Sequence, residues 1–278
     1  MSWRKYLLVP RVATAAMGRV PAPEVAWDLF WRDVHRTGPD GEVLWDGADE
    51  LEMRWWLDTA REHLDRSLPV VDVGAGNGRL SRLLADSFPS VLGLDVSPAA
   101  ILLASRESSG RPNLSFQVLD ITAEGVGAAL SSQLGPANVV VRGVFHVLDT
   151  DGRRRAAANL AEVLAGRGSL LLGETNYPGD LLEYLEYLGG RSGRLPSPLA
   201  RLIDHKTPRP SAFGAAQLAE MFPTPAWTIV SSGAMQIAPV RSLGSAAGRT
   251  IPGFYAVVRA GRQAAELNER HQQLPGKR

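Results

Sequence analysis

Apolar and polar positions along the middle of the chain predict buried strands followed by helices. Residues 70–73 form a β-branched apolar run broken only by Asp72, which is typical of a parallel strand covered on both faces. A glycine-rich turn follows, and the apolar residues of 79–88 then fall on one helical face. This stretch therefore predicts a strand, a tight turn and a helix.

The same pattern recurs toward the carboxyl end and predicts further buried strands with helices between them. The expected parallel strands are 70–73, 91–94, 113–118, 138–142 and 168–173. The expected helices include 98–106, 153–164, 181–188 and 215–221. Two later apolar runs are separated by prolines and glycines and predict a long hairpin, at 227–237 and 251–258. The predicted fold class is therefore α/β, with a seven-stranded, mostly parallel sheet.

The first 66 residues predict helices that are rich in tryptophan. An amphipathic helix is expected near 24–36 and a second one from about 49 to 66, with a short extended piece at 42–46 between them. Two interpretations stay open, because this segment either packs on the domain as structure only or covers a ligand. In the second case the candidate pocket residues are Trp45, Asp46 and Arg54.

Composition excludes several classes of protein. The chain has 278 residues and no cysteine, which excludes disulfides, thiolate catalysis and zinc–thiolate sites. A formal net charge of +1 provides no basic field for nucleic acid, and no apolar run is long enough to span a membrane. Pro10 and Arg11 interrupt the first apolar stretch, so we expect a flexible or packed leader in a cytoplasmic protein. The preference for arginine over lysine indicates a GC-rich bacterial genome.

The turn after the first strand carries the clearest chemistry. Gly74, Gly76 and Gly78 let the backbone turn tightly and approach a ligand closely. Asp95 ends the next strand, where a carboxylate can accept hydrogen bonds from ribose hydroxyls while the glycines admit the rest of a cofactor. A dinucleotide site favours G-x-G-x-x-G, whereas here the third glycine comes one place early and Arg79 occupies the position it would need.

Two motifs together point to a family. They are Asp72-Val73-Gly74-Ala75-Gly76-Asn77-Gly78 and Leu94-Asp95-Val96-Ser97. In this order and spacing they resemble the first two motifs of the class I S-adenosylmethionine (SAM)-dependent methyltransferases. The resemblance implies a Rossmann-like three-layer sandwich with an antiparallel C-terminal strand pair and an N-terminal helical cap. It also implies SAM as the cofactor and S-adenosylhomocysteine (SAH) as the product, with no metal.

The resemblance implies roles for individual residues at the cofactor. Asp95 would bind the ribose, Asp120 would hydrogen-bond the adenine amino group, and Ile121 would pack on the adenine face. A helix cap stays the alternative for Asp120. The complete set expected at the cofactor is Asp72, Gly74, Ala75, Gly76, Asn77, Gly78, Asp95, Val96, Asp120, Ile121, Arg142, Gly143 and Trp45.

The turn after the fourth strand should face the transferred methyl group, because ligands bind beyond the carboxyl ends of parallel strands. His146 in this turn is the candidate general base, since a neutral imidazole can take a proton from a phenol, hydroxyl or ammonium. A role in shaping the pocket alone is the alternative. Glu174 is a second candidate, as a base or an electrostatic partner. The residues expected at the substrate are Phe145, His146, Asn176, Tyr177 and Tyr184.

These observations predict a methyltransferase built from three regions. They are an N-terminal helical cap at 1–66, a SAM-binding methyltransferase domain at 67–262 with a substrate or lid insertion at 189–223, and a tail at 263–278. The expected reaction transfers a methyl group to an oxygen or nitrogen atom of a small organic molecule in bacterial specialised metabolism. The alternatives are a peptide or protein acceptor, SAM binding without catalysis, and a dinucleotide enzyme. The expected partner is a small-molecule methyl acceptor, with a homodimer as an open assembly and with neither nucleic acid nor membrane.

Overall fold

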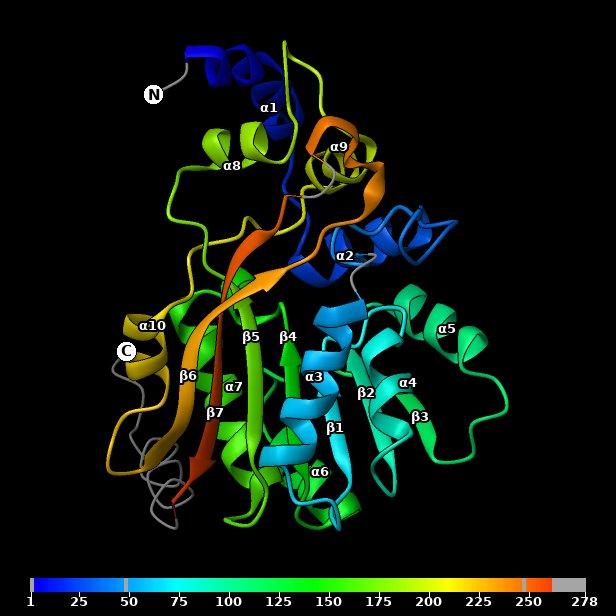
Figure 1. The fold of residues 1–278 in the computed structure, drawn as a ribbon, viewed down its shortest axis with the longest axis vertical. Coiled ribbons are helices and arrows are strands. Elements are labelled where there is room, and N and C mark those ends of the chain that lie inside the picture. Colours follow the sequence, from blue (N-terminus) through cyan, green and yellow to red (C-terminus); the bar gives the residue numbers. More distant parts are fainter. Residues whose placement is uncertain (1–2, 48–49, 247–248, 262–278) are drawn as a thin grey trace.

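The computed structural model describes residues 3–47, 50–246 and 249–261, so the predicted tail at 263–278 lies outside the described residues. Within these ranges, seven strands form one sheet in the order β3-β2-β1-β4-β5-β7-β6 (Figure 1). The strands are β1 Val70–Val73, β2 Val91–Asp95, β3 Leu114–Val118, β4 Asn138–Arg142, β5 Leu170–Thr175, β6 Trp227–Ile237 and β7 Ile251–Ala260. β7 is antiparallel to both of its neighbours, and the other pairs are parallel. The predicted fold class is confirmed.

The register of the parallel strands brings their carboxyl ends to one edge of the sheet. Val73 of β1 is aligned with Leu94 of β2 on one side and with Val141 of β4 on the other. The residues that come next in each segment are the glycine turn, Asp95 and Arg142. The register therefore places residues from separate parts of the sequence at one site.

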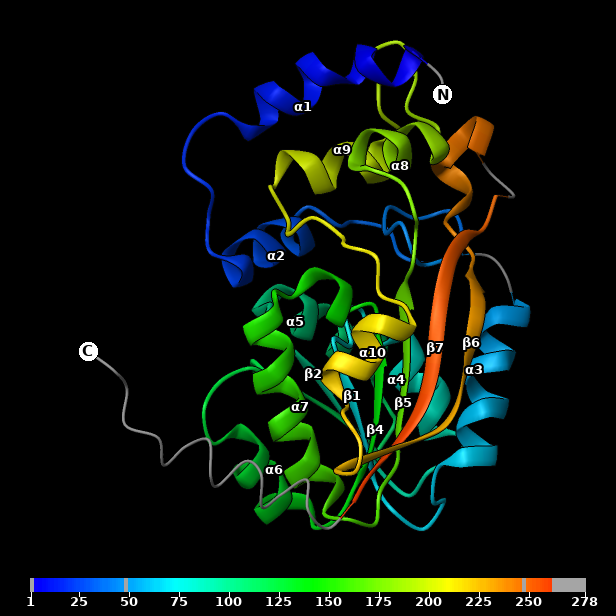
Figure 2. The same cartoon turned by 90° about the vertical axis from the view of Figure 1, so that its left-hand side faces the viewer.

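Helices cover both faces of the sheet (Figure 2). They are α3 Glu50–His63, α4 Arg79–Ala85, α5 Pro98–Glu107, α6 Val126–Leu134, α7 Thr150–Leu164 and α10 Ala215–Met221. Val70 shares a core with Trp56 of α3, whereas its neighbour Val71 shares a different core with Leu160 of α7. Successive strand residues point to opposite faces, so β1 is apolar on both sides and buried throughout.

A further group of helices stands above the carboxyl edge of the sheet, and we call it the upper lobe (Figure 1). It consists of η1 Trp3–Leu8, α1 Val9–Ala16, α8 Leu181–Tyr187, α9 Ser197–Asp204 and η3 Arg241–Ala246. Helix α2, Pro23–Arg32, lies between this lobe and the sheet (Figure 2). Leu8, Leu185 and Leu199 share one core with Trp56 and Val257 of the sheet layers. The upper lobe is therefore packed on the sheet through a continuous core.

Two expectations about local structure need correction. Residues 42–46 form turns instead of an extended piece. The composition of 189–210, within the predicted insertion, predicts a lid or substrate loop, but the segment contains α9. The helix forms because Pro198 occupies its first turn and its apolar side, which includes Leu199, is buried against the upper lobe. The stretch is rich in glycine and proline only at its two ends, which is why composition suggested a loop.

Ion pairs fasten the N-terminal segment to the upper lobe. Lys5 Nζ lies 2.8 Å from both Asp180 Oδ2 and Glu183 Oε1 at the start of α8. Hydrogen bonds to these two carboxylates hold the pKa of the Lys5 ammonium above its ordinary value. Arg11 Nη2 pairs with Asp204 Oδ1 of α9 at 2.5 Å. The segment η1–α1 is thereby tied to both α8 and α9.

Candidate active site

The glycine turn between β1 and α4 leaves no room for side chains. Gly74 and Gly76 have positive φ angles of 74° and 55°, which L side chains rarely adopt. A Cβ on Gly74 would lie 2.3 Å from Val144 Cγ2, and one on Gly76 would lie 2.8 Å from Trp31 Cζ2. The turn therefore presents bare backbone to the space above the sheet, with Trp31 of α2 lying against it.

Asp95 connects the end of β2 to this turn. Its Oδ2 accepts a hydrogen bond from Gly76 N at 3.0 Å, and its Oδ1 accepts one from Ser97 N at 3.0 Å. Burial raises the pKa of the carboxyl to about 6, and the backbone hydrogen bonds oppose that rise. A carboxylate has about four acceptor positions, so Asp95 can still accept a hydrogen bond from a ligand hydroxyl beside its bonds to the backbone.

A cavity of about 500 Å³, which we call the lower cavity, opens at this edge of the sheet. Most of the residues predicted at the cofactor line it, and they come from the ends of four neighbouring strands and from the cap. Those residues are Gly74, Gly76, Asp95, Val96, Asp120, Ile121, Arg142, Gly143 and Trp45. The sheet register thus brings them together around one space.

Four other predicted cofactor residues do not line the lower cavity and support the turn from behind. Asp72 accepts a hydrogen bond from Ser81 Oγ, and burial raises its pKa to about 6. Asn77 Nδ2 donates to Asp46 Oδ2 at 2.8 Å, which ties the turn to the cap. The remaining two, Ala75 and Gly78, pack against the neighbouring strands. A Cβ on Gly78 would meet Phe116, and the Ala75 Cβ lies where a Cβ on Gly93 would meet it.

Asp120 stabilises a turn and also lines the lower cavity. Its Oδ1 accepts hydrogen bonds from Thr122 N and Thr122 Oγ1, both at 2.8 Å, so it stabilises the turn after β3. The same residue lines the lower cavity beside the buried Ile121. The second carboxylate oxygen makes neither of these bonds and is available to a donor from a ligand.

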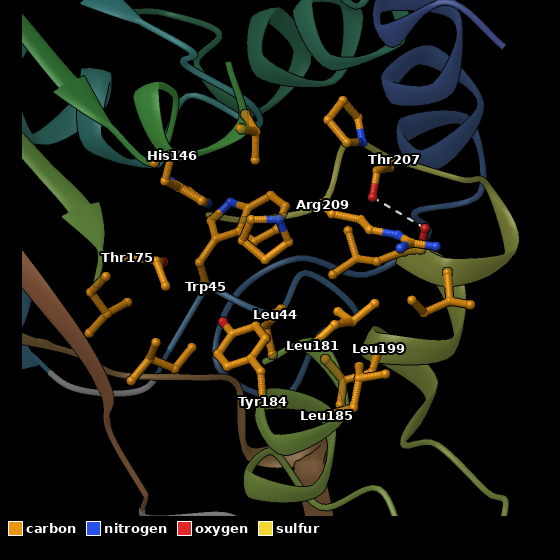
Figure 3. Close-up of a pocket in the computed structure, with 18 of the residues that line it drawn as sticks. Leu44, Trp45, His146, Thr175, Leu181, Tyr184, Leu185, Leu199, Thr207 and Arg209 are labelled. Carbon is orange, nitrogen blue, oxygen red and sulfur yellow. Dashed lines mark hydrogen bonds between the residues drawn. The ribbon is translucent and has the colours of Figure 1, made fainter. Parts of the chain in front are cut away.

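A second cavity, which we call the upper cavity, has a volume of about 110 Å³ and lies against the upper lobe (Figure 3). His146, Thr175 and Tyr184 line it together with apolar side chains of α8 and α9. Hydrogen bonding joins Tyr184 to Thr175, and burial raises the pKa of the phenol. The residues that line both cavities are Trp27, Trp45, Arg142, Gly143, Val147 and Pro208. This shared wall makes the two cavities neighbours.

His146 is held by Glu174, whose side chain is completely buried. Glu174 Oε1 accepts hydrogen bonds from Val144 N at 3.1 Å and Phe145 N at 2.9 Å. Its Oε2 accepts one from His146 N at 3.1 Å and lies 2.6 Å from His146 Nδ1. The carboxylate therefore fixes the 3₁₀ turn η2, Phe145–Val147, and engages Nδ1, which leaves His146 Nε2 for the upper cavity.

Arg142 links the shared wall to the cap. Its Nη2 lies 2.7 Å from Glu52 Oε1 of α3, and it also donates to the Trp45 carbonyl at 2.9 Å. Glu52 Oε2 in turn accepts a hydrogen bond from Ala238 N at 2.7 Å. The guanidinium is thereby neutralised, and the Trp45 ring is positioned over the site by a backbone contact.

Three residues predicted at the substrate lie outside both cavities. Phe145 is fully buried and packs on Phe213 and Phe222, because the 3₁₀ turn directs it into the core while its neighbour His146 faces the cavity. Tyr177 contacts Tyr184 and Tyr187 within an aromatic cluster. The third is Asn176, which follows the inward-facing Thr175. Two candidate pocket residues of the N-terminal segment, Asp46 and the exposed Arg54, also line neither cavity.

Sequence reasoning missed most of the upper cavity. Its apolar wall comes from Leu181, Leu185, Leu199, Leu202 and Ile203, with further contacts from Trp27, Ile237 and Ile251. The signal that could have found the α9 part is the strong segregation of its apolar residues onto one side of the helix. No comparable signal marks the other residues, because leucine and isoleucine lining a site look like core residues in a sequence.

Two further observations concern possible metal ligands and membrane-spanning helices. In the part of the chain that the structure describes, no group of His, Cys, Asp and Glu side chains could hold a metal ion. None of the described helices has the length and apolar character needed to cross a membrane.

Comparison with known proteins extends these observations. Residues 70–168 match a family model described as a methyltransferase domain. A SAM-dependent methyltransferase from Anabaena variabilis ATCC 29413 is 26% identical and has a TM-score of 0.72, covering 88% of this chain and 99% of that chain.

Two more distant structures share the fold. One comes from work on the conversion of a disulfide bond into a thioacetal group during echinomycin biosynthesis; it is 22% identical, with a TM-score of 0.63, covering 90% of this chain and 98% of that chain. The other is the N-methyltransferase NodS from Bradyrhizobium japonicum WM9 in complex with SAH, which is 16% identical with a TM-score of 0.52. It covers 85% of this chain and 98% of that chain.

The fold, the glycine turn facing Asp95 and these likenesses define the class of protein. Residues 70–168 form a methyltransferase domain, and the chain as a whole is similar to the class I SAM-dependent methyltransferases. It is therefore an enzyme whose cofactor is SAM, and its reaction requires a methyl acceptor.

Proposed function

We propose that this enzyme methylates an oxygen or nitrogen atom of a small organic molecule by in-line displacement. The observation that carries the proposal is the pair of adjoining cavities with a shared wall. A cofactor in the lower cavity and an acceptor in the upper cavity meet at that wall. Because the upper lobe packs over the acceptor side, the geometry favours a small molecule over an extended chain.

The lower cavity has the groups needed to hold each part of SAM. Asp95 accepts hydrogen bonds from the ribose hydroxyls, and Asp120 accepts one from the adenine amino group while Ile121 packs on its ring. Gly74 and Gly76 lie along the ribose and methionine portions, and a side chain at either position would clash with Val144 or Trp31. Trp45 lines both cavities, so its ring lies at the position where the sulfonium and the acceptor meet.

The protein contributes positioning, exclusion of water and a base. When bound, SAM supplies an activated methyl group on a sulfonium. The shared wall aligns the acceptor atom with that group, and such alignment can lower the barrier by several kcal/mol, on the order of 7 at full effect. His146 Nε2 removes the proton of the acceptor, and Glu174 stabilises the imidazolium that results.

Specialised metabolism is the setting that we favour. The likeness to the structure from echinomycin biosynthesis covers nearly the whole of both chains, and it supports a small acceptor in a bacterial pathway of that general kind. The arginine-rich composition agrees with a bacterial source. A cytoplasmic location and a homodimer stay predictions of the sequence.

The proposal is tested by calorimetry followed by a transfer assay. Titration with SAM, SAH and NAD should show binding of the first two and none of NAD. Protein incubated with isotope-labelled SAM should then pass the label to members of a library of small hydroxyl- and amine-bearing compounds. Binding of NAD in place of SAM, or transfer confined to peptides in a parallel library, would contradict the proposal.

A further inference from the structure

We infer that the acceptor is an apolar molecule that carries no positive charge and is methylated on an acidic hydroxyl, such as a phenol or an enol. This inference rests on the proposed function and narrows it. It follows from the charges that line the upper cavity, from the character of its walls, and from the charge changes of the two alternative reactions.

No acidic side chain lines the upper cavity in the described part of the chain. Its titratable lining residues are Arg142, His146, Tyr184 and Arg209. Arg142 is already paired with Glu52, at 2.7 Å. Glu174 is fully buried behind His146 and accepts hydrogen bonds from three backbone N–H groups and Nδ1. A cationic acceptor would therefore find no counter-charge in this cavity.

The apolar walls of the upper cavity make binding of a cation without a counter-charge unfavourable. Two helices and the ends of two strands surround the space with leucine and isoleucine, at Leu181, Leu185, Leu199, Leu202, Ile203, Ile237 and Ile251. Moving an ammonium group from water into such surroundings without a partner is strongly unfavourable, because burial without a counter-charge disfavours the charged form. An aliphatic or aromatic body without charge gains free energy from the same walls.

Transfer to oxygen moves the positive charge of the sulfonium onto His146, whereas transfer to a neutral amine moves it first onto the acceptor nitrogen. For a hydroxyl acceptor, the O–H proton passes to His146 Nε2, an O–C bond forms, and the C–S bond breaks with its electron pair left on sulfur. The products are a neutral methyl ether and neutral SAH, and the imidazolium is balanced by Glu174 at 2.6 Å. A neutral amine attacks with its proton still in place, so the new N–C bond puts the positive charge on nitrogen among apolar walls until a proton passes to His146 Nε2. The cavity therefore favours oxygen.

Arg209 extends the inference to acceptors that carry a carboxylate in addition to the hydroxyl. It lines the upper cavity from the loop after α9, its side chain is exposed, and it has no ion pair or hydrogen bond within the described residues. Figure 3 shows Arg209 and His146 on opposite sides of Trp45. A molecule with its hydroxyl at His146 could thus place a carboxylate near the Arg209 guanidinium at the other end.

The test compares three ligands that share a naphthalene ring. Protein saturated with SAH is titrated by calorimetry, at neutral pH, with naphthol, with hydroxynaphthoate and with naphthylmethylamine. We expect naphthol and hydroxynaphthoate to bind, and the ammonium compound to bind at least about tenfold more weakly. Arg209→Gln should weaken hydroxynaphthoate about threefold and leave naphthol unchanged. The matched control is Arg106→Gln, an exposed arginine of α5 outside both cavities, which should change neither.

A variant that adds a carboxylate to the upper cavity tests the charge argument while keeping the apolar side chains in place. Thr207 lines the upper cavity near Arg209, and Thr207→Asp should raise the affinity for naphthylmethylamine about threefold. The inference is overturned if the wild-type protein binds the ammonium compound as tightly as naphthol, or if neither hydroxyl compound binds. Loss of SAH binding is a separate result, because it would overturn the proposed function itself.

Discussion

The two cavities of this enzyme are built in different ways. The lower cavity is formed by short segments that directly follow neighbouring strands, and much of its surface is backbone at Gly74 and Gly76. The upper cavity is formed by side chains from the cap, from α8 and α9, and from the ends of β6 and β7. Binding of SAM therefore depends on local backbone geometry, whereas binding of the acceptor depends on how distant segments pack together.

This difference makes the two cavities separable by mutation. A change in the glycine turn should alter the affinity for SAM or SAH and leave the acceptor cavity intact. A change in the upper lobe should do the reverse. Only residues of the shared wall, and the base beside it, should affect turnover without a matching loss of either ligand.

The largest effect is expected at His146. His146→Gln keeps the size of the side chain but removes the base, so kcat should fall about 100- to 1,000-fold while the affinity for SAH is unchanged. His205→Gln is the matched control, because His205 pairs with Asp33 at 2.7 Å and lines neither cavity. Steady-state kinetics and calorimetry measure the two quantities. An unaltered kcat across the pH range would exclude His146 as the base.

The next effect is expected in the glycine turn. Gly76→Val places a Cβ 2.8 Å from Trp31 and forces a β-branched residue into a φ of 55°, so SAH affinity should fall about 100-fold. Gly110→Val is the control that separates the effect of backbone strain from that of the steric clash. Gly110 has a φ of 86°, but an added Cβ there meets nothing within 4 Å. Equal losses of SAH affinity in the two variants would show that the turn does not contact the cofactor.

Asp95 should give a smaller, pH-dependent effect. Asp95→Asn should weaken SAH binding about tenfold at neutral pH, because a charge-assisted acceptor is lost. Burial raises the pKa of Asp95 to about 6, so in the wild type this carboxylate becomes protonated below that pH. The affinity for SAH should therefore fall as the pH drops through 6. In Asp95→Asn the same titration should be flat, as measured by calorimetry from neutral to mildly acidic pH.

One control keeps this pH test specific. Asp72 also has its pKa raised to about 6, so Asp72→Asn shows whether that group behind the turn contributes to the pH dependence. The positive charge of Arg142 partly opposes the rise in the pKa of Asp72 that burial causes. A wild-type profile without any decline toward acid pH would contradict the assignment of Asp95 to the ribose.

The smallest effect is expected where the N-terminal segment joins the upper lobe. Lys5→Met removes the contacts to Asp180 and Glu183 at the start of α8, which carries Leu181 and Tyr184 of the upper cavity. We expect the acceptor KM to rise about threefold, with SAH affinity unchanged, because exposed carboxylates limit the strength of the pair. Turnover kinetics with a productive acceptor provide the measurement. A loss of SAH affinity instead would show that the two cavities are not separable.

Much of the fold could be predicted because its elements have strong periodicity. The strands at 138–142 and 227–237 and the helix at 215–221 have the predicted bounds. Most of the lower cavity could be predicted for a related reason, since its residues follow strands whose ends must meet at one edge. The upper cavity could not, because Trp27, Leu199 and Ile251 become neighbours only through tertiary packing.

The positions of Phe145 and Asn176 outside both cavities have one physical cause. Thr175 faces the upper cavity and the next residue, Asn176, does not, while His146 faces it and the preceding residue, Phe145, packs in the core. Successive residues point in different directions, so a shift of one position moves a side chain from the site to the interior. Sequence alone located the two turns but not the direction of each side chain within them.

A crystal structure of the protein with SAH tests the central claim most directly. The account predicts the ribose hydroxyls within hydrogen-bonding distance of Asp95, the adenine beside Asp120 and Ile121, and the sulfur at the shared wall next to Trp45. SAH bound in the upper cavity, or a glycine turn closed by its own side-chain neighbours with SAH elsewhere, would contradict it.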